Sequence, residues 1–278
     1  MVNIGLNGKS ESTLKNYGRS LAKAALYFGK CPTLISDEKI NQYLLLLRDT
    51  QQPSYSYFKH TVYGLRLAFR LIEREDRAIR LPSIKKIKTL PTVLSRAECR
   101  TLFSTPKLLK HRTLLCLVYS AGLRISEVAN LRQADIDMDR MQIHIRQSKN
   151  NKDRMVPLAE YMKDGLLKYY GACCPREFVF NGGDGHRALS VRAIQYILRE
   201  TVGKTDIKKR VTLHTLRHSY ATHLCEDGLD ILTIRDLLGH EDVTTTMVYL
   251  HVAGRDRSKA YSPFDTLYSK KQKDVSTE

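Results

Sequence analysis

The stretch HTLRHSYATHL, residues 214–224, places two cations on one face of an expected helix. His214 and Arg217 are three residues apart, so on a helix their side chains point the same way. The stretch contains no carboxylate that could neutralise them, and an arginine inside an otherwise apolar helix needs a partner. We therefore expect a helix at 214–227, ended by Gly228, with a face open to an anionic ligand.

Length and charge indicate two domains that bind a polyanion. The chain has 278 residues, 42% of them hydrophobic, which is enough for two cores. Its formal net charge is +17, and residues 1–88 alone hold 16 Lys and Arg against 7 Asp and Glu. Because the surplus is spread over both halves, nucleic acid is the favoured partner, although charge alone names neither its sequence nor its number of strands. A general anionic-surface binder or a solubility charge is the alternative.

The cysteines and the apolar pattern indicate a reduced protein of the cytoplasm. None of the six cysteines forms a C-x-x-C pair. The first residues, MVNIGLNGKS, do not have the pattern of a signal peptide, and no apolar run approaches the roughly 18 residues of a membrane span. We therefore expect a cytoplasmic, nucleoid-associated protein with no structural disulfide and no membrane segment.

No cofactor or metal ion is expected. His214 and His218 form H-x-x-x-H, but the glutamate of H-E-x-x-H is missing. We expect His218 and His223 on helix faces away from Arg217, as packing or surface residues. The sequence also has no phosphate-binding G-x-x-x-x-G-K-[ST] loop and no acidic cluster suited to two metal ions.

Residues 1–85 are predicted to form a helical DNA-binding domain. Apolar residues recur with the helical period in the segments 12–28, 36–47 and 54–72. A row of arginines at helical spacing is either a solvated face or one that follows DNA phosphates: Arg66, Arg70, Arg74 and Arg77. The Pro- and Lys-rich stretch LPSIKKIKTLPTVL (81–94) follows, and we place the linker at 86–91 within it. The basic residues predicted to contact DNA are Arg66, Arg70, Lys85, Lys86 and Lys152.

Residues 92–278 are predicted to form a mainly helical domain with a small antiparallel β-hairpin. Ser95 and Glu98 form a capping box near its start. Apolar and polar residues alternate at 141–146, and RMVPL (154–158) fits the return strand, with Lys149 near the tip. Further helices are expected at 108–120, 124–131, 190–201, 230–238 and 244–250. A polar tail begins at about 256.

Six groups of this domain together suit a phosphodiester substrate: Arg124, Lys149, His214, Arg217, His240 and Tyr249. Two guanidinium groups can clamp non-bridging oxygens and stabilise a pentacoordinate transition state, with hydrogen bonds from two histidines. A lysine can protonate the leaving oxygen, and a tyrosine hydroxyl can attack phosphorus. Taken singly, each residue also has an ordinary structural explanation, such as an ion pair, a helix cap or core packing.

Four segments in this order resemble the tyrosine recombinase (phage integrase) family, in particular its Xer and integron-integrase branch. They are AGLRISEVANL (121–131), SKNNKDRMVPL (148–158), HTLRHSYATHL (214–224) and LLGHEDVTTTMVYLHV (237–252). The resemblance covers most of the chain. It implies a two-domain DNA clamp, in which a helical, SAM-like core-binding domain precedes a mixed α/β catalytic domain.

The resemblance also implies the role of each residue. Arg124, Arg217, His214 and His240 would hold the scissile phosphate, and Glu127 would orient Arg124. Tyr249 would be the nucleophile, whereas Tyr220, on the same helix as Arg217, is expected to pack. Lys149 would be the general acid, with Lys152 as an alternative in a hairpin whose SKNN turn departs from the family's glycine-rich one.

The implied function is site-specific recombination of DNA, as in mobile genetic elements, through a 3′-phosphotyrosine and a Holliday junction. A homotetramer is expected on DNA, and a monomer or weak oligomer in its absence. The alternatives are DNA relaxation like that of type IB topoisomerases and a non-catalytic DNA-binding regulator on the same fold. The sequence does not specify the target site, nor whether the task is integration, inversion, transposition or resolution.

Overall fold

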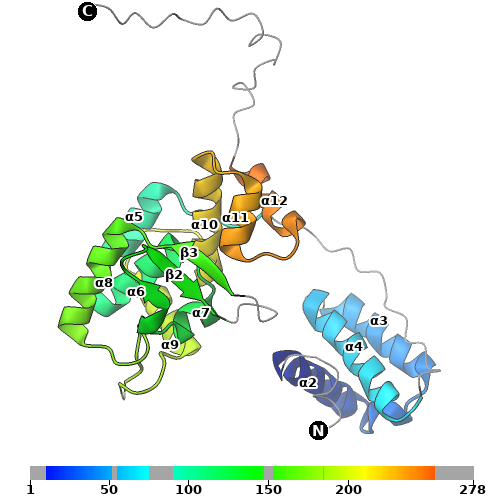
Figure 1. Ribbon diagram of the computed structural model, residues 1–278. Coiled ribbons are helices and arrows are strands. Elements are labelled where there is room, and N and C mark those ends of the chain that lie inside the picture. The colour runs from blue at the N-terminus through cyan, green and yellow to red at the C-terminus, as the bar shows by residue number, and fades with distance from the viewer. Residues whose placement is uncertain (1–10, 52–54, 75–89, 147–152, 184, 254–278) are drawn as a thin grey trace, which may run out of the picture. The chain divides into compact units, whose positions relative to one another are not determined.

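The described part of the chain forms two compact units, divided between Lys88 and Thr89 (Figure 1). The computed structural model describes residues 11–51, 55–74, 90–146, 153–183 and 185–253. The fold is mainly helical with one small antiparallel sheet, which confirms the predicted fold class. None of the helices in the described ranges is long and apolar enough to cross a membrane.

The first unit is all-helical. It consists of α2 (Glu11–Phe28), the short 3-10 helix η1 (Pro32–Leu34), α3 (Asp37–Gln51) and α4 (Tyr55–Leu71). Their apolar faces meet in a core that includes Ile40, Leu44, Phe58, Val62, Leu65 and Phe69. The amphipathic period therefore located these helices well, because each buries one face against the other two.

The predicted arginine row is shorter than expected. Arg66 and Arg70 lie on α4 and are exposed, and the Arg66 guanidinium lies 5.6 Å from the centre of the Tyr63 ring. Helix α4 ends because Glu73 adopts a left-handed φ of +57°, with the Arg74 N–H bonded back to the Phe69 carbonyl. Arg74 therefore does not continue the helical face. Arg77, Lys85 and Lys86 lie outside the described residues.

The second unit contains a three-stranded antiparallel sheet, ordered β1 (Ile136–Asp137), β2 (Gln142–Ile145) and β3 (Arg154–Pro157). Ile143 pairs with Val156, and both side chains are buried. The predicted hairpin is thus confirmed in its strands, whereas β1 is too short to give an alternating pattern. Lys149 and Lys152 lie outside the described residues.

The described part of the second unit also contains the short 3-10 helix η2 (Gln133–Asp135) and eight α-helices. The eight are α5 (Arg96–Ser104), α6 (Leu109–Ser120), α7 (Ile125–Asn130), α8 (Glu160–Cys173), α9 (Val191–Val202), α10 (Leu213–Glu226), α11 (Ile231–Leu238) and α12 (Val243–Val252). Helix α10 is the central one: ten of its fourteen residues are buried, and it packs against α6, α11 and α12. The sequence did not predict α8, whose Gly165 and Gly171 weaken the helical signal.

The start of the second unit is fastened to α10 by hydrogen bonds. The Leu94 N–H donates to Ser219 Oγ at 2.9 Å, and the Leu94 carbonyl lies 3.0 Å from His223 Nε2. The other ring nitrogen of His223 lies 2.8 Å from the Tyr119 hydroxyl. His223 is therefore a buried packing residue, as the sequence predicted, and it fixes the helix that carries His214 and Arg217.

Candidate functional site

Three arginines from three different elements converge on the C-terminal end of α11. Arg154 Nε donates to the Leu237 carbonyl at 2.8 Å, and Arg124 Nη2 donates to the Gly239 carbonyl at 2.9 Å. Between them, Arg217 Nη2 donates to the Leu238 carbonyl. The last carbonyls of a helix lack helical partners and carry the negative end of its dipole, so they attract cations. The turn after α11 therefore aligns the arginine cluster, defined as Arg124, Arg154 and Arg217.

One carboxylate, Glu127 of α7, lies inside the arginine cluster. Its Oε1 accepts from Arg124 Nη1 and Arg154 Nη1, both at 2.7 Å. Its Oε2 accepts from the Arg124 backbone N–H at 2.7 Å and from Arg154 Nη2 at 2.8 Å. Burial raises the pKa of Glu127, but the hydrogen bonds and charge of Arg154, together with Arg124, outweigh burial and lower the pKa to about 2. The Glu127 carboxylate is therefore ionised at neutral pH.

Arg217 is the most buried cation of the cluster, with a side chain 4% exposed. Its Nη1 donates to the Gly122 carbonyl at 2.7 Å and lies 3.9 Å from Glu127 Oε2. Burial and the charge of Arg124 lower the pKa of Arg217 to about 9, so it still carries its charge at pH 7. The nearest carboxylate to Arg217 in the cluster thus comes from a segment 90 residues earlier in the chain, and it forms no hydrogen bond with Arg217.

Tyr249 of α12 lies beside the same cluster. Its hydroxyl is 2.9 Å from His218 Nδ1, and the residue is 1% exposed. Burial raises the pKa of Tyr249 to about 12, although the charges of Arg217 and Arg124 oppose the shift. Burial, His214 and Arg217 lower the pKa of His218 to about 4. At neutral pH the pair is therefore a phenol and a neutral imidazole.

The prediction that His218 faces away from the cluster as a packing or surface residue is wrong. Helix α12 packs on this side of α10 and brings Tyr249 to His218 across 31 residues of sequence. A signal was present, because His214 and His218 are four residues apart and share a helix face; their ring centres are 6.5 Å apart.

The two predicted histidines border the cluster. His240 follows α11, and its Nδ1 lies 2.9 Å from Thr246 Oγ1. Burial, with the charges of Arg217 and Arg124, lowers the pKa of His240 to about 3. His214 reaches the surface, yet surrounding protein atoms and the same two arginines lower its pKa too. The structure therefore brings together six predicted residues: Arg124, Glu127, His214, Arg217, His240 and Tyr249.

Sequence reasoning missed Arg154. On β3 its side chain shares the inward face with the buried Val156, while Met155 points outward and is 48% exposed. A cation on the inward face of a strand requires a buried partner. That alternation was visible in RMVPL, but the identity of the partner, Glu127, was not.

The low histidine pKa values predict acid sensitivity of the free protein. His240 and His218 have folded pKa values below the ordinary 6.5, so the unfolded chain binds protons first as the pH falls. Stability should therefore drop between pH 6.5 and about 4, by about 1 kcal/mol per histidine at pH 5, because solvent partly screens both rings. Urea unfolding at pH 7 and pH 5 measures this loss. His240→Asn, which can keep the hydrogen bond to Thr246, should lose less free energy of unfolding on acidification than the wild type. An equal loss in the two proteins would show that protonation of His240 is not the cause.

Gly122, whose carbonyl holds Arg217, also has no room for a side chain. Its φ is +58°, and a Cβ atom would lie 2.5 Å from Tyr220 Cδ1. Gly122→Ala should lower the free energy of unfolding by about 2–5 kcal/mol, because left-handed strain adds to overpacking. The matched control is Gly228→Ala, where φ is +93° but no atom lies within 4 Å; only strain of about 1–2 kcal/mol is expected there. Equal losses in chemical denaturation would show that the Tyr220 ring gives way.

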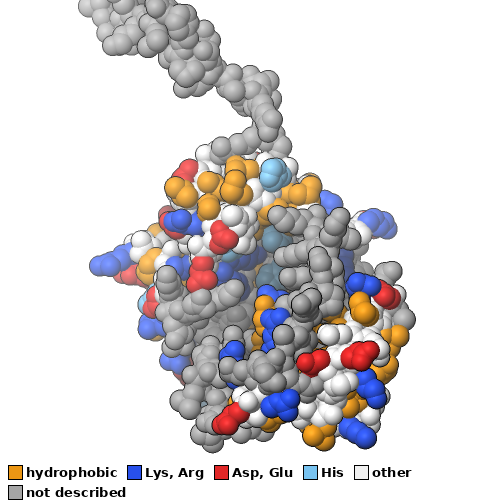
Figure 2. All heavy atoms as spheres, turned by 90° about the vertical axis from the view of Figure 1, so that its right-hand side faces the viewer, with side chains coloured by type: hydrophobic (Ala, Val, Ile, Leu, Met, Phe, Trp, Pro, Cys, Tyr) orange, Lys and Arg blue, Asp and Glu red, His pale blue; other side chains and the backbone are white. Residues whose placement is uncertain are grey.

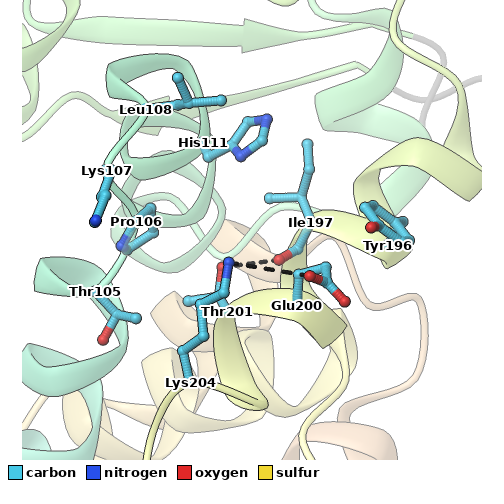
Figure 3. A pocket seen from close by; sticks show the side chains of 10 residues that line it. All are labelled: Thr105, Pro106, Lys107, Leu108, His111, Tyr196, Ile197, Glu200, Thr201 and Lys204. Atoms are coloured by element: carbon cyan, nitrogen blue, oxygen red, sulfur yellow. Dashed lines mark hydrogen bonds and ion pairs between the residues drawn. The ribbon is translucent and has the colours of Figure 1, made fainter.

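A separate pocket of roughly 440 Å³ lies between the start of α6 and helix α9 (Figure 3). Lys107, His111, Tyr196 and Lys204 contribute to its wall. The Lys204 ammonium, in the turn after α9, lies 4.0 Å from the Glu200 carboxylate. None of the six predicted site residues lines this pocket, so the arginine cluster is a distinct site. Among the described residues, no group of three or more His, Cys, Asp or Glu side chains is arranged to hold a metal ion.

Comparisons with known proteins agree with the geometry. The model of the phage integrase family matches residues 92–255. A tyrosine recombinase of Thermosipho africanus is 35% identical over 265 residues, covering 90% of this chain and 92% of the relative. Tyrosine recombinase XerA of Thermococcus kodakarensis is 34% identical over 264 residues, covering 92% of this chain and 90% of the relative.

The solved structure of the Tn1549 transposon integrase, in complex with a circular intermediate DNA, has the same fold. The TM-score is 0.70 at 17% identity, and the match covers 95% of each chain. By the family match and by its identity to these relatives, the chain belongs to the phage integrase family and is a tyrosine recombinase of the Xer-like branch.

Proposed function

We propose that the protein cuts and rejoins double-stranded DNA through a covalent bond between Tyr249 and the 3′ phosphate. The observation that carries the proposal is the Tyr249 hydroxyl, which lies 2.9 Å from His218 Nδ1 beside the arginine cluster. As the Tyr249 oxygen bonds to phosphorus, its proton passes to the neutral His218 ring, and the bond from phosphorus to the 5′ oxygen breaks. The 5′-hydroxyl of a partner strand then reverses the step.

The arginine cluster supports this chemistry electrostatically. Arg124 and Arg217 are charged groups whose nitrogens can bind the non-bridging oxygens bidentately. His214 and His240 are neutral at pH 7 because their pKa values are lowered, so they add hydrogen bonds rather than charge. Cationic side chains thereby stabilise the charge that develops in the transition state, and the proposed reaction uses no metal ion and no nucleotide.

A general acid for the 5′ oxygen is the remaining requirement. We assign it to Lys149, with Lys152 as the alternative. Both lie outside the described residues, and the support is their position in the sequence between β2 and β3. The second of these strands begins at Arg154, which is bound to the cluster through Glu127.

Attack by Tyr249 requires a movement of α12. At 1% exposure, the residue has no surface that a DNA phosphate could touch. Helix α12 is ten residues long and follows the Gly239 turn, so it can shift while α10 stays fixed in the core. We propose that DNA binding drives this shift and brings the Tyr249 hydroxyl to the phosphate while His218 stays within reach of its proton.

The partner is double-stranded DNA with specific recombination sites. Both halves of the chain are basic, and Arg66 and Arg70 of the first unit are exposed. Exchange between two duplexes needs four reactive tyrosines, so we propose a homotetramer on DNA and a Holliday-junction intermediate. Figure 2 shows hydrophobic side chains at the surface of the unit that carries α11 and α12. Leu232 of α11 and Met247 of α12 are 52% and 45% exposed, and we propose that they contact another subunit.

A plasmid assay tests the proposal against its alternatives. The protein is incubated with a supercoiled plasmid that carries two copies of the DNA flanking its own gene. Recombined circles and four-way junctions, with protein attached covalently to a 3′ end, are the expected products. Relaxed circles alone would favour topoisomerase-like activity. DNA binding without any covalent adduct would favour a regulator and overturn the proposal.

A further inference from the structure

We propose that Arg154 is a positioning residue that saturates Glu127 and thereby keeps Arg217 free for the DNA phosphate. The inference rests on the proposed function, but it concerns a residue with no assigned part in the reaction. It answers a physical problem of the site. An ionised carboxylate placed among phosphate-binding arginines competes with the phosphate for their donors.

The hydrogen bonds of Glu127 show how the competition is avoided. A carboxylate has about four acceptor positions, and Glu127 has four donors within 2.8 Å: two from Arg154 and two from Arg124. Arg217 Nη1 remains 3.9 Å from Oε2, beyond hydrogen-bond distance. Arg154 supplies half of the donors, in the bidentate geometry that is strongest for a guanidinium.

Arg154 itself is held where it cannot bind DNA. Its side chain is 8% exposed, against 19% for Arg124. Each of its three nitrogens donates to a protein acceptor, either Glu127 or the Leu237 carbonyl. A Cβ atom on Gly239 would lie 3.0 Å from Arg154 Cδ, so the left-handed glycine after α11 leaves the room that this arginine occupies. The side chain is thus shaped to face Glu127 and the helix end.

Without Arg154, Glu127 should accept a hydrogen bond from Arg217. Two acceptor positions would open, and a shift of about 1 Å would bring Arg217 Nη1 into hydrogen-bond distance of Oε2. The local formal charge would also fall from +2 to +1, because three arginines and one glutamate become two arginines and one glutamate. Arg217 would then pair with Glu127 instead of with phosphate, and cleavage would slow without a comparable loss of DNA affinity.

Two measurements test the inference independently of each other. The first is a crystal structure of DNA-free Arg154→Gln, in which we expect a direct hydrogen bond between Arg217 and Glu127. This arm does not depend on the proposed function. If Arg217 stays where it is, the inference is overturned even if the wild type recombines DNA.

The second measurement is single-turnover cleavage of a nicked duplex that carries the recombination site, with DNA affinity measured separately. Arg154→Gln should lower the cleavage rate constant on the order of 10²-fold, as expected when a reacting group is misplaced by about 1 Å. The dissociation constant should change by less than roughly threefold, because Arg154 does not contact DNA. The matched control is Arg140→Gln, which removes an exposed arginine from the turn between β1 and β2 and should cleave at the wild-type rate.

A double-mutant cycle separates positioning from general damage. In the Glu127→Gln background no carboxylate competes for Arg217. Adding Arg154→Gln to that background should therefore lower the cleavage rate constant less than roughly threefold. If Arg154→Gln lowers the cleavage rate constant by the same factor in the wild-type and Glu127→Gln proteins, the inference is overturned. Should Arg154→Gln fail to fold, Arg154→Lys keeps the charge but loses the bidentate bond, and it should still slow cleavage roughly tenfold. A wild-type rate in folded Arg154→Lys would also reject the proposal. A wild type that forms no adduct would instead reject the proposed function.

Discussion

Tyr249→Phe is expected to abolish the covalent DNA adduct and to leave the fold unchanged. The substitution removes only the hydroxyl, while the ring keeps its place in the cluster of Tyr220, Cys225, Ile234 and Leu238. Without a nucleophilic oxygen, cleavage should fall by at least about 10⁴-fold, as for other enzymes that lose their nucleophile. Denaturing gels of the protein incubated with a nicked duplex substrate measure the adduct.

Tyr220→Phe is the matched control for this prediction. Tyr220 is also buried, at 7% exposure, and it lies on α10 three residues after Arg217. Its ring packs against Gly122, so its role is to support the backbone that holds Arg217. The adduct should form at the wild-type rate in this variant. Loss of the adduct in Tyr220→Phe but not in Tyr249→Phe would overturn the assignment of the nucleophile.

Arg217→Lys is expected to have the second largest effect. A lysine keeps the charge but cannot donate to the Gly122 and Leu238 carbonyls and to a phosphate with the fixed geometry of a guanidinium. Loss of one donor to a developing charge typically costs about 10²–10³-fold in rate, and we expect a fall of this size in single-turnover cleavage. The free energy of unfolding should also decrease, because a buried carbonyl loses its donor.

Arg235→Lys provides the comparison for Arg217→Lys. Arg235 lies on α11, where it pairs with Asp236 at the surface, and it does not contact the Glu127 carboxylate. The Arg235→Lys variant should cleave at the wild-type rate, because Arg235 is not part of the arginine cluster. Its stability should also change little, since an exposed ion pair contributes little to stability. If both variants cleave at the wild-type rate, Arg217 does not hold the phosphate.

The helices of this protein were largely predictable from its sequence. The apolar period located α2, α3 and α4 to within a few residues, because each buries one face. Helices α6, α9 and α10 were also predicted to within a few residues. The capping box of Ser95 and Glu98 is present at α5. Local signals failed where they were weak: β1 is two residues long, α8 contains two glycines, and a left-handed Glu73 ended α4 before Arg74.

The site was predictable as a list of residues but not as a network. The order of the motifs pointed to seven residues, and the structure brings six of them together; the seventh, Lys149, lies outside the described residues. Their partners were hidden, because Arg154 meets Glu127 across 27 residues and His218 meets Tyr249 across 31. No periodicity within one helix or strand reports such a contact.

The sequence by itself determined that His214 and Arg217 would share one face of α10, since their spacing fixes their directions on any helix. Only the tertiary structure decided which groups surround these two side chains. It bound Arg124, Arg154 and Arg217 to the carbonyls that end α11, and it enclosed Glu127 among them. The physical reason is that burial makes every charge depend on its neighbours, and those neighbours are set by the packing of α7, α10, α11 and β3 together.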